Sequence, residues 1–372
     1  MLMKNQNTIS LSEFQLSLIR ADLPFVSYRS PHQDKPVTLY GAENFRQFNS
    51  LQEMLEHKHG FAVAPFREEG PFYWLDRRQS VTGFEVSREI ISGHSAPRRE
   101  WPLPEGEPAG KEKYLSLLRQ ALHYIEAGVA GKIVLSRWLL HHWPGAANKG
   151  GEIFRELCDI HSAAFVYLFH IPGMGLWTGA SPELLIESSG GKIQTVSLSG
   201  TRKKTGSLQP WGNKETNEHL WVSRYIEEQL ELLGCEDIEV NPMQTVEAGT
   251  VEHLRTNFSA SCPVSKLPSL VYALHPTPAV CGWPTARAYD LIGRIENYDR
   301  SFYTGFIGPV EEPGDFRFYV NLRCMNILQD HCVVYVGGGI TIDSDPENEW
   351  QETELKSRTM LGAIEKIANF GG

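Results

Sequence analysis

The sequence predicts an α/β fold in which antiparallel sheets carry helices on their outer faces. Strand-like runs follow one another through tight turns, as at residues 188–191, where Ser-Ser-Gly-Gly is typical of a hairpin. Only a few long amphipathic segments interrupt these runs. A doubly wound parallel sheet would require strands and helices to alternate regularly, and this chain does not show that alternation.

The first third of the chain is expected to contain short strands, then a linker, then a helix. Strand-like runs occupy residues 61–65, 72–75 and 81–86. The Pro- and Gly-rich stretch 95–113 is the best candidate for a linker. Beyond it, apolar residues recur at helical spacing from Tyr114 to Ile125, and Gly128 suits the C-terminal end of that helix.

The rest of the chain predicts the main strands and three further helices. The strands are expected at residues 132–140, 164–170, 184–187 and 192–198, with a paired set at 316–324 and 332–336. The helices are expected at residues 215–233, ended by Gly234, at 285–295 after Pro284, and at 349–368. A length of 372 residues allows one large domain or two medium ones.

Composition and charge exclude several classes of protein. Apolar residues make up 41% and charged residues 22% of the chain, which is ordinary for a globular protein in water. The net charge of −10 argues against nucleic acid or an anionic membrane as a partner, so an anionic substrate needs local positive groups or a metal. From the polar N-terminus we expect no signal segment, and the given sequence contains no apolar run of membrane-spanning length. The six Cys show no C-x-x-C spacing, so we expect buried thiols and a cytoplasmic protein.

Two pairs of acidic residues stand out as candidate metal ligands. Glu215 and Glu218 lie three residues apart on one predicted helix, and Glu349 and Glu352 lie three apart on another. This spacing places both carboxylates of a pair on one helical face. There they could bind a hard cation such as Mg²⁺ directly or through water. A solvated acidic face is the alternative interpretation.

Lys132 and Glu183 are candidates for acid–base chemistry. Lys132 begins a strongly apolar strand, and a Lys held in a low-dielectric environment has a lowered pKa and can act as a general base. Glu183 precedes another strand, and a carboxyl group near apolar side chains retains its proton and can act as a general acid. The alternatives are a Lys at a strand end that points to solvent and an ordinary Glu in a turn.

Three further features of the last quarter suggest ligand binding. Arg323 is predicted in mid-strand, where its guanidinium suits a substrate carboxylate, although a structural ion pair is equally compatible. Gly337–Gly339 do not form a dinucleotide fingerprint, because Ile342 stands where the third glycine is needed and no helix follows directly. Without side chains, however, these glycines leave their backbone N–H groups open to close approach by a ligand. His275 and Thr277 lie between prolines on a rigid loop, where a lone His is more often structural than catalytic.

Together these features resemble the chorismate-utilising enzymes: isochorismate synthase, salicylate synthase, anthranilate synthase component I and aminodeoxychorismate synthase. The motifs that carry the resemblance are, in order, GKIVLSR, ASPELL, LSGTR, KETNEH, HPTPAV with GWP, RSFYTGFIG, NLRC, GGGI and EWQETELK. They cover residues 113–370, while residues 1–112 match loosely. The resemblance implies one chorismate-utilising domain over residues 1–372. It also implies two antiparallel sheets packed face to face, with outer helices and a central cleft, as in anthranilate synthase component I.

The resemblance also implies a role for each matching residue. Glu218 and Glu352 correspond to Mg²⁺ ligands, and Glu215 and Glu349 to partners that act through water or support the ligands. The substrate-binding positions are Arg323 and Tyr303 at the side-chain carboxylate, Gly200, Thr201 and Gly337 as backbone contacts, His275 and Thr277 near the ring, and Lys356 at the carboxylate on the metal side.

Three positions indicate the branch of the family. Lys132 matches the enzymes that activate water, whereas the ammonia-using anthranilate enzymes usually carry Gln there. Ser199 lies where aminodeoxychorismate synthases carry a nucleophilic Lys, and it also departs from the Ala usual in isochorismate synthases. The loop at residues 275–284 resembles the water-using branch.

The expected activity is therefore that of an Mg²⁺-dependent isochorismate synthase, in which water attacks C2 of chorismate and the C4 hydroxyl leaves. Lys132 would be the base and Glu183 the acid. The alternatives are a salicylate synthase, an ammonia-using relative, and a catalytically silent paralogue that binds chorismate or a partner. We expect a monomer whose product serves menaquinone or siderophore synthesis.

Overall fold

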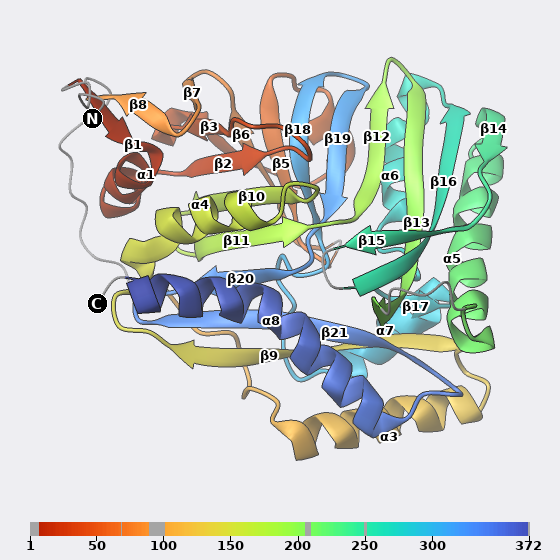
Figure 1. Ribbon diagram of the computed structural model, residues 1–372. Helices are drawn as coiled ribbons and strands as arrows, with labels where there is room; N and C mark the ends of the chain where they lie inside the picture. The colour runs from red at the N-terminus through yellow and green to blue at the C-terminus, as the bar shows by residue number, and fades with distance from the viewer. Residues whose placement is uncertain (1–6, 68, 89–100, 205–209, 249–250, 371–372) are drawn as a thin grey trace.

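The computed structural model describes residues 7–67, 69–88, 101–204, 210–248 and 251–370. Within these ranges the chain forms two large sheets and a small strand pair, with helices packed against the sheets (Figure 1). Neighbouring strands pair antiparallel throughout both sheets. The fold class predicted from the sequence is therefore confirmed.

The nine-stranded sheet combines strands from the beginning, middle and end of the chain. Its spatial order is β17 (Gly282–Trp283), β9 (Lys132–His142), β21 (His331–Thr341), β20 (Cys324–Ile327), β11 (Gly175–Ser181), β10 (Phe165–Ile171), β2 (Phe25–Arg29), β3 (Val37–Tyr40) and β7 (Ser80–Thr82). The longest pairing joins β9 to β21 in a continuous register that places Lys132 opposite Thr341. This pairing forms one wall of the site described below.

The ten-stranded sheet also combines strands from distant parts of the chain. Its spatial order is β14 (Glu236–Val240), β16 (Val251–Ser261), β13 (Lys192–Lys203), β12 (Leu184–Ser189), β19 (Asp315–Val320), β18 (Phe306–Glu312), β5 (Gly60–Ala64), β6 (Phe72–Asp76) and β4 (Phe45–Phe48), while β15 (Gln244–Ala248) pairs with β16. A separate pair joins β1 (Thr8–Ser10) to β8 (Glu85–Ser87). Strands from the first 112 residues thus extend both large sheets.

Helices cover the outer faces of both sheets. Their bounds are α1 (Leu11–Arg20), α2 (Leu51–Leu55), α3 (Lys111–Glu126), α4 (Gly150–Ile160), α5 (Asn213–Leu232), α6 (Leu267–Leu274), α7 (Thr285–Ile295) and α8 (Pro346–Phe370). Apolar side chains of α1, α4 and α8 pack on the nine-stranded sheet, and those of α2, α5 and α6 on the ten-stranded sheet. Helices α3 and α7 pack around β9. Among the helices that the structure describes, none combines the length and apolar character of a membrane span.

The two sheets face each other across a core that is rich in aromatic rings. Strand β10 shows how one sequence serves both faces, because alternate side chains of a strand point to opposite sides. Phe165, Tyr167 and Phe169 enter the core between the sheets, whereas Val166 and Leu168 pack against the outer helices. Burial of β10 on both of its faces explains the nearly continuous apolar run in this strand.

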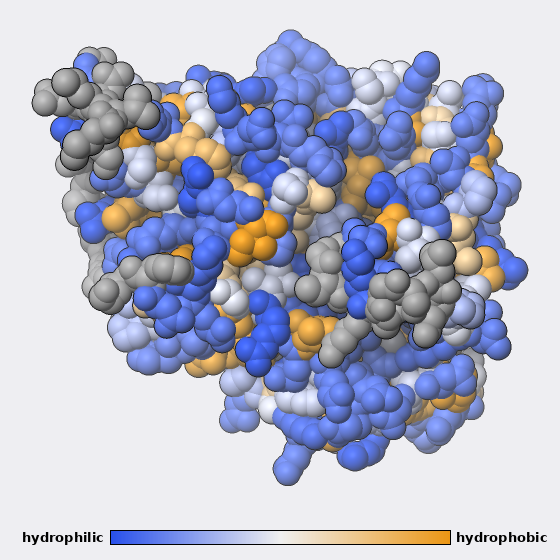
Figure 2. Space-filling view, in the orientation of Figure 1, coloured by the Kyte–Doolittle hydropathy of each residue, from blue (hydrophilic) through white to orange (hydrophobic). Residues whose placement is uncertain are grey.

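The outer surface in Figure 2 is, by contrast, largely hydrophilic with scattered apolar side chains.

The chain crosses between the sheets twice at one corner. It passes from β11 to β12 through Glu183, and from β19 to β20 through Arg323. The backbone N–H of Ala180 donates to the carbonyl of Arg323 at 3.1 Å, and that of Val320 donates to the carbonyl of Glu183 at 3.0 Å. These bonds hold the two crossings side by side, so residues far apart in sequence meet there.

The strands and helices expected from the sequence are present, with corrections to some of them, but the expectations did not include α1, α2, α4 or α6 or several of the strands. The run 81–86 forms the separate strands β7 and β8, and the run 316–324 is divided between β19 in one sheet and β20 in the other. The three glycines at 337–339 lie inside β21 and do not follow it. Of the predicted linker 95–113, residues 95–100 fall outside the described part of the chain, and residues 111–113 belong to α3. All six cysteines are free and buried, as expected.

Candidate active site

A cavity lies at the sheet corner, next to the N-terminal turns of α5 and α8. It encloses about 1040 Å³ of space, including its mouth toward solvent, which is ample for a small-molecule ligand. Side chains of β13, β21, both helices and the two crossings form its walls. Lys214 of α5, Lys356 of α8 and Arg323 of the second crossing bring positive charge to this space. The cavity thus offers local attraction for an anion within a chain of net negative charge.

Glu183 lies at the first crossing and lines the cavity. Its side chain is 5% exposed, and burial raises the pKa of its carboxyl group to about 7, although Lys132 and Lys356 oppose this shift. A carboxyl group with a pKa raised in this way retains its proton much closer to neutral pH than an exposed Glu does, which suits a general acid. The structure therefore supports the proton retention expected for Glu183 and excludes an ordinary exposed turn residue.

Lys132 is fully buried at the start of β9, so it does not point to solvent. Its Nζ lies 2.7 Å from Oε1 of Glu218, yet the contact lacks the angle of a hydrogen bond, and Nζ has no well-directed partner among the described residues. Gly339 on β21 leaves the room for this pair, because a Cβ there would lie 2.7 Å from Lys132 Cε. A buried amine without a directed partner can take a water or a substrate oxygen.

Two Glu–Lys contacts extend the charged wall along α8. Glu349 Oε1 accepts hydrogen bonds from Lys214 Nζ at 2.8 Å and from Ser344 Oγ at 2.7 Å. Lys356 Nζ contacts Glu352 Oε1 at 2.6 Å and donates to the carbonyl of Gly337 at 2.8 Å. Burial raises the pKa of Glu349 and the neighbouring Glu352 adds to the shift. For Glu352 burial is the largest single influence and acts in the same direction, but Lys356, Lys214 and Arg323 together outweigh it, so the net pKa shift is downward.

Glu215 lines the same cavity from the first turn of α5. It packs over Gly200, whose φ of +63° is in the left-handed region, and a Cβ on Gly200 would meet Glu215 Cβ at 3.3 Å. Gly200 therefore suits both the backbone bend and the close approach of the helix. Thr201 follows on β13, but its side chain falls outside the described part of the structure.

Arg323 lines the cavity from the second crossing and not from mid-strand as predicted. Its φ of +49° is in the left-handed region, which costs a residue other than glycine about 1–2 kcal/mol. Tyr303 and Gly337 line the cavity with it, and a Cβ on Gly337 would lie 3.0 Å from Tyr303 Oη. The arginine, the phenol and the open glycine backbone together form a group suited to a carboxylate.

His275 and Thr277 do not line the cavity, although the resemblance placed them near the substrate ring. His275 is buried, its Nε2 bonds to the carbonyl of Pro65 at 3.2 Å, and burial lowers its pKa to about 4. The carbonyl of Thr277 accepts from the backbone N–H groups of Val280 and Cys281. In this structure both residues shape the loop that brings Val280 to the cavity wall.

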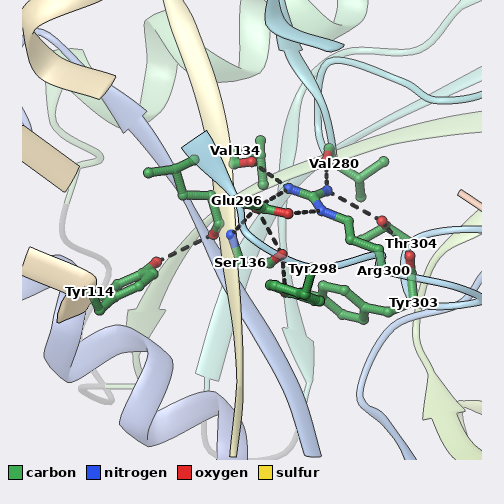
Figure 3. Close-up of polar contacts among 10 residues, drawn as sticks. Tyr114, Val134, Ser136, Val280, Glu296, Tyr298, Arg300, Tyr303 and Thr304 are labelled. Atoms are coloured by element: carbon green, nitrogen blue, oxygen red, sulfur yellow. Dashed lines mark hydrogen bonds and ion pairs between the residues drawn. The ribbon is translucent and has the colours of Figure 1, made fainter. Parts of the chain in front are cut away.

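A fully buried ion pair behind the cavity was not predicted from the sequence. Arg300 donates to both carboxylate oxygens of Glu296, at 2.6 and 2.8 Å (Figure 3). Its remaining hydrogens bond to the carbonyls of Val134 and Val280 and to Thr304 Oγ1. The last three residues all line the cavity, so this pair fixes part of its wall. The sequence did offer one signal for this ion pair, because Glu296 and Arg300 lie four residues apart in the segment ENYDR.

His219, one residue beyond Glu218, is a second feature that the sequence did not reveal. Its ring is fully buried and contacts hydroxyl groups on both sides, with Ser199 Oγ 3.0 Å from Nδ1 and Thr256 Oγ1 2.9 Å from Nε2. Burial lowers the pKa of His219 to about 4. Of these residues, Ser199 lines the cavity.

Several carboxylates of the cavity are candidate ligands for a divalent cation. Within the described ranges, no three His, Cys, Asp or Glu side chains form a ready-made metal cage. Mg²⁺, however, commonly takes one or two carboxylates and completes its shell with water and substrate oxygens. Glu218, Glu349 and Glu352 all line the cavity, and the repulsion that helps raise the pKa of Glu349 is one that a cation would relieve. The residues present therefore fit a hydrated divalent cation.

The known proteins that this chain resembles in sequence and in fold all belong to one group, the chorismate-utilising enzymes. Residues 61–362 match the family of chorismate binding enzymes. The isochorismate synthase DhbC of Bacillus subtilis is 32% identical over 74% of this chain and 72% of its own. The menaquinone-specific isochorismate synthase MenF of Escherichia coli has a similar fold, with a TM-score of 0.77, 23% identity, and coverage of 93% of this chain and 91% of its own. Anthranilate synthase component I of Streptococcus pneumoniae also shares the fold, with a TM-score of 0.69, 18% identity, and coverage of 97% and 93%.

Proposed function

Because this chain belongs to the family of chorismate binding enzymes, we propose that it is an isochorismate synthase. In the proposed reaction a water oxygen bonds to C2 of chorismate, the ring double bonds shift, and the C4 hydroxyl leaves as water. Water is consumed and released, so the net reaction is an isomerisation. The observation that carries the proposal is the placement of a buried carboxyl group, Glu183, whose pKa burial raises, and a buried amine, Lys132, beside one cavity.

Glu183 is the proposed acid. Chorismate must lose a hydroxyl group, and hydroxide is a poor leaving group unless it receives a proton. A carboxyl group with a pKa near 7 holds such a proton at neutral pH and can release it during the reaction. The position of Glu183 at the sheet crossing keeps it among buried groups, which maintains the raised pKa.

Lys132 is the proposed base. Its Nζ has no well-directed hydrogen bond to the described protein groups, so in the neutral form its lone pair is available to a water molecule. The contact with Glu218 holds the amine at the end of β9. A positioned base of this kind contributes about 10²–10⁴-fold to the rate.

Arg323 and Tyr303 are proposed to bind the side-chain carboxylate of chorismate, because both line the cavity and can donate to one anion. Lys356 and the backbone of Gly200 and Gly337 are proposed to hold the rest of the substrate.

Glu218 and Glu352 are the proposed ligands of Mg²⁺, with Glu215 and Glu349 supporting them. When bound, the cation would supply electrostatic stabilisation for charge that develops on the ring carboxylate. We further propose that the isochorismate supplies menaquinone or siderophore synthesis.

The test is to incubate the purified protein with chorismate and Mg²⁺, without ammonia, and to identify the product by chromatography and mass spectrometry. Isochorismate as the product would support the proposal. Salicylate with pyruvate would assign the chain to the branch that also eliminates pyruvate. Product formed with ammonia alone, or chorismate left intact, would contradict the proposal.

A further inference from the structure

The hydroxyl group of Ser199 lies in the part of the cavity wall that β13 and α5 form. Its neighbours determine whether it donates or accepts a hydrogen bond on the protein side. Ser199 lines the cavity, and its Oγ lies 3.0 Å from Nδ1 of His219. On the other side of the ring, Nε2 lies 2.9 Å from Thr256 Oγ1 and 3.2 Å from Ser197 Oγ. The imidazole is fully buried, so its hydrogen bonds are made to these hydroxyl groups.

The positions of the hydrogens follow from the partners of Thr256. Its hydroxyl is buried, and among the described residues its side chain bonds only to His219 Nε2. Buried hydroxyl hydrogens are nearly always paired, so Thr256 donates to Nε2. A neutral imidazole has one accepting and one donating nitrogen, and Nδ1 must therefore carry the hydrogen. Ser197 does not change this assignment, because its hydroxyl has a second partner in Ser223 at 2.8 Å.

This assignment makes Ser199 an acceptor toward His219 and leaves its own hydrogen free to enter the cavity. We propose that Ser199 donates a hydrogen bond to an oxygen atom of the bound substrate, and that His219 is a positioning residue that fixes this donor through the chain Thr256–His219–Ser199. The identity of the substrate as chorismate rests on the proposed function.

The same assignment excludes a nucleophilic role for Ser199. An activated serine needs a neighbouring base that accepts its proton. Protonated Nδ1 of His219 faces Ser199 and cannot accept that proton. Ser199 therefore contributes to substrate specificity, because its hydroxyl group favours a substrate that places a hydrogen-bond-accepting oxygen at this wall.

A spectroscopic test addresses the hydrogen positions without substrate. The protein is labelled with ¹⁵N-histidine, and the ring resonances of His219 are identified as those missing from the His219→Gln variant. We expect the two-bond ¹⁵N–¹H pattern of the Nδ1–H tautomer. The Nε2–H tautomer, or a doubly protonated ring at neutral pH, would overturn the proposal whatever the enzyme's reaction is.

A kinetic test uses two matched substitutions of the ring. In His219→Asn the side-chain amide replaces Nδ1 and can still donate to Ser199, whereas in His219→Gln it replaces Nε2 and cannot. Ser199→Ala should lower kcat/KM for chorismate by about tenfold, the value of one hydrogen bond. His219→Gln should match Ser199→Ala, and His219→Asn should remain closer to the wild type.

The double variant Ser199→Ala/His219→Gln separates positioning from a general structural effect. If His219 acts through Ser199, the double variant should be no slower than the slower single variant. Unchanged kcat/KM in Ser199→Ala, or losses that multiply in the double variant, would overturn the proposal. Absence of any turnover in the wild type would instead contradict the proposed function, while the tautomer measurement would still decide the hydrogen positions.

Discussion

The cavity and the buried ion pair behind it use the same kinds of charged group in opposite ways. In the pair of Glu296 and Arg300, each side chain is 1% exposed and every guanidinium nitrogen donates a hydrogen bond. Glu296 also accepts from the backbone N–H and the hydroxyl of Ser136. Every guanidinium hydrogen is paired and both side chains are buried, so the pair is closed to a ligand.

The cavity pairs are incomplete by comparison. Lys132 is as deeply buried as Arg300 but has no directed hydrogen bond among the described groups, and the side chains of Glu352 and Lys356 are 33% and 21% exposed. A buried charged pair whose hydrogens are all bonded to the protein holds the surrounding backbone in place. A charged group that still has an unused donor or acceptor atom can bind substrate, water or metal. The predictions below test this difference, from the largest expected effect to the smallest.

Removing the carboxylate of Glu218 should have the largest effect on activity. Glu218→Gln keeps the volume of the side chain but removes the charge that attracts a cation, so stimulation by Mg²⁺ should be lost. Turnover is measured against Mg²⁺ concentration, with Glu227→Gln on the exposed face of the same helix as the control. An unchanged Mg²⁺ dependence would remove Glu218 from the proposed ligands.

Removing the acidic proton of Glu183 should slow the reaction by about 10²–10⁴-fold. Glu183→Gln is nearly isosteric, so the fold should survive, as measured by circular dichroism and thermal unfolding. The exposed Glu312→Gln on β18 is the matched control. Turnover of Glu183→Gln near the wild-type rate would reject Glu183 as the acid.

Breaking the buried pair of Glu296 and Arg300 should lower the free energy of unfolding more than breaking an exposed ion pair does. Arg300→Met leaves Glu296 buried without its partner, which costs about 3–5 kcal/mol in free energy of unfolding. The control is Arg77→Met, which removes an ion pair with Glu311 whose side chains are 35% and 48% exposed and should cost less than about 1 kcal/mol. Denaturant unfolding measures both. Equal losses would contradict the distinction between saturated and open pairs.

The smallest effect concerns pH. The pKa of Glu183 is raised from 4.5 to about 7, so the acid is increasingly lost above pH 7, and kcat/KM should fall about tenfold per pH unit there. The protonated form also stabilises the fold relative to the charged form. That contribution is fully present below pH 4.5 and is lost as the pH rises through about 7.

Glu183→Gln has no such titration, so its stability relative to the wild type should increase between pH 4.5 and 7. Thermal unfolding of both proteins across this range measures the difference. A constant difference would show that Glu183 does not titrate with a raised pKa.

Local patterns predicted the elements that depend on neighbouring residues. Helical spacing located α5, α7 and α8, and the acidic pairs on α5 and α8 do face one cavity. Apolar neighbours in the sequence indicated Glu183 and Lys132, and motif resemblance added Tyr303. Glu183 and Tyr303 line the cavity, while Lys132 contacts the lining residue Glu218. Their chemical roles remain predictions until the variants are measured.

Features that depend on distant parts of the chain could not be predicted in this way. The run 316–324 reads FRFYVNLRC, and neither its apolar residues nor their spacing reveals that its two ends belong to different sheets. The left-handed backbone of Arg323 follows from that crossing. Likewise, the hydroxyl partners of His219 come from β13 and β16, which only folding brings to α5.

The most direct test of the account is to run the reaction with chorismate and Mg²⁺ in H₂¹⁸O and to determine by mass spectrometry whether the product contains solvent oxygen. The account predicts isochorismate with ¹⁸O in its new C2 hydroxyl, at a rate strongly reduced in Glu183→Gln and Lys132→Ala. Isochorismate without ¹⁸O would mean that the hydroxyl migrates within the substrate, and it would contradict the assignment of Lys132 as the base that activates water.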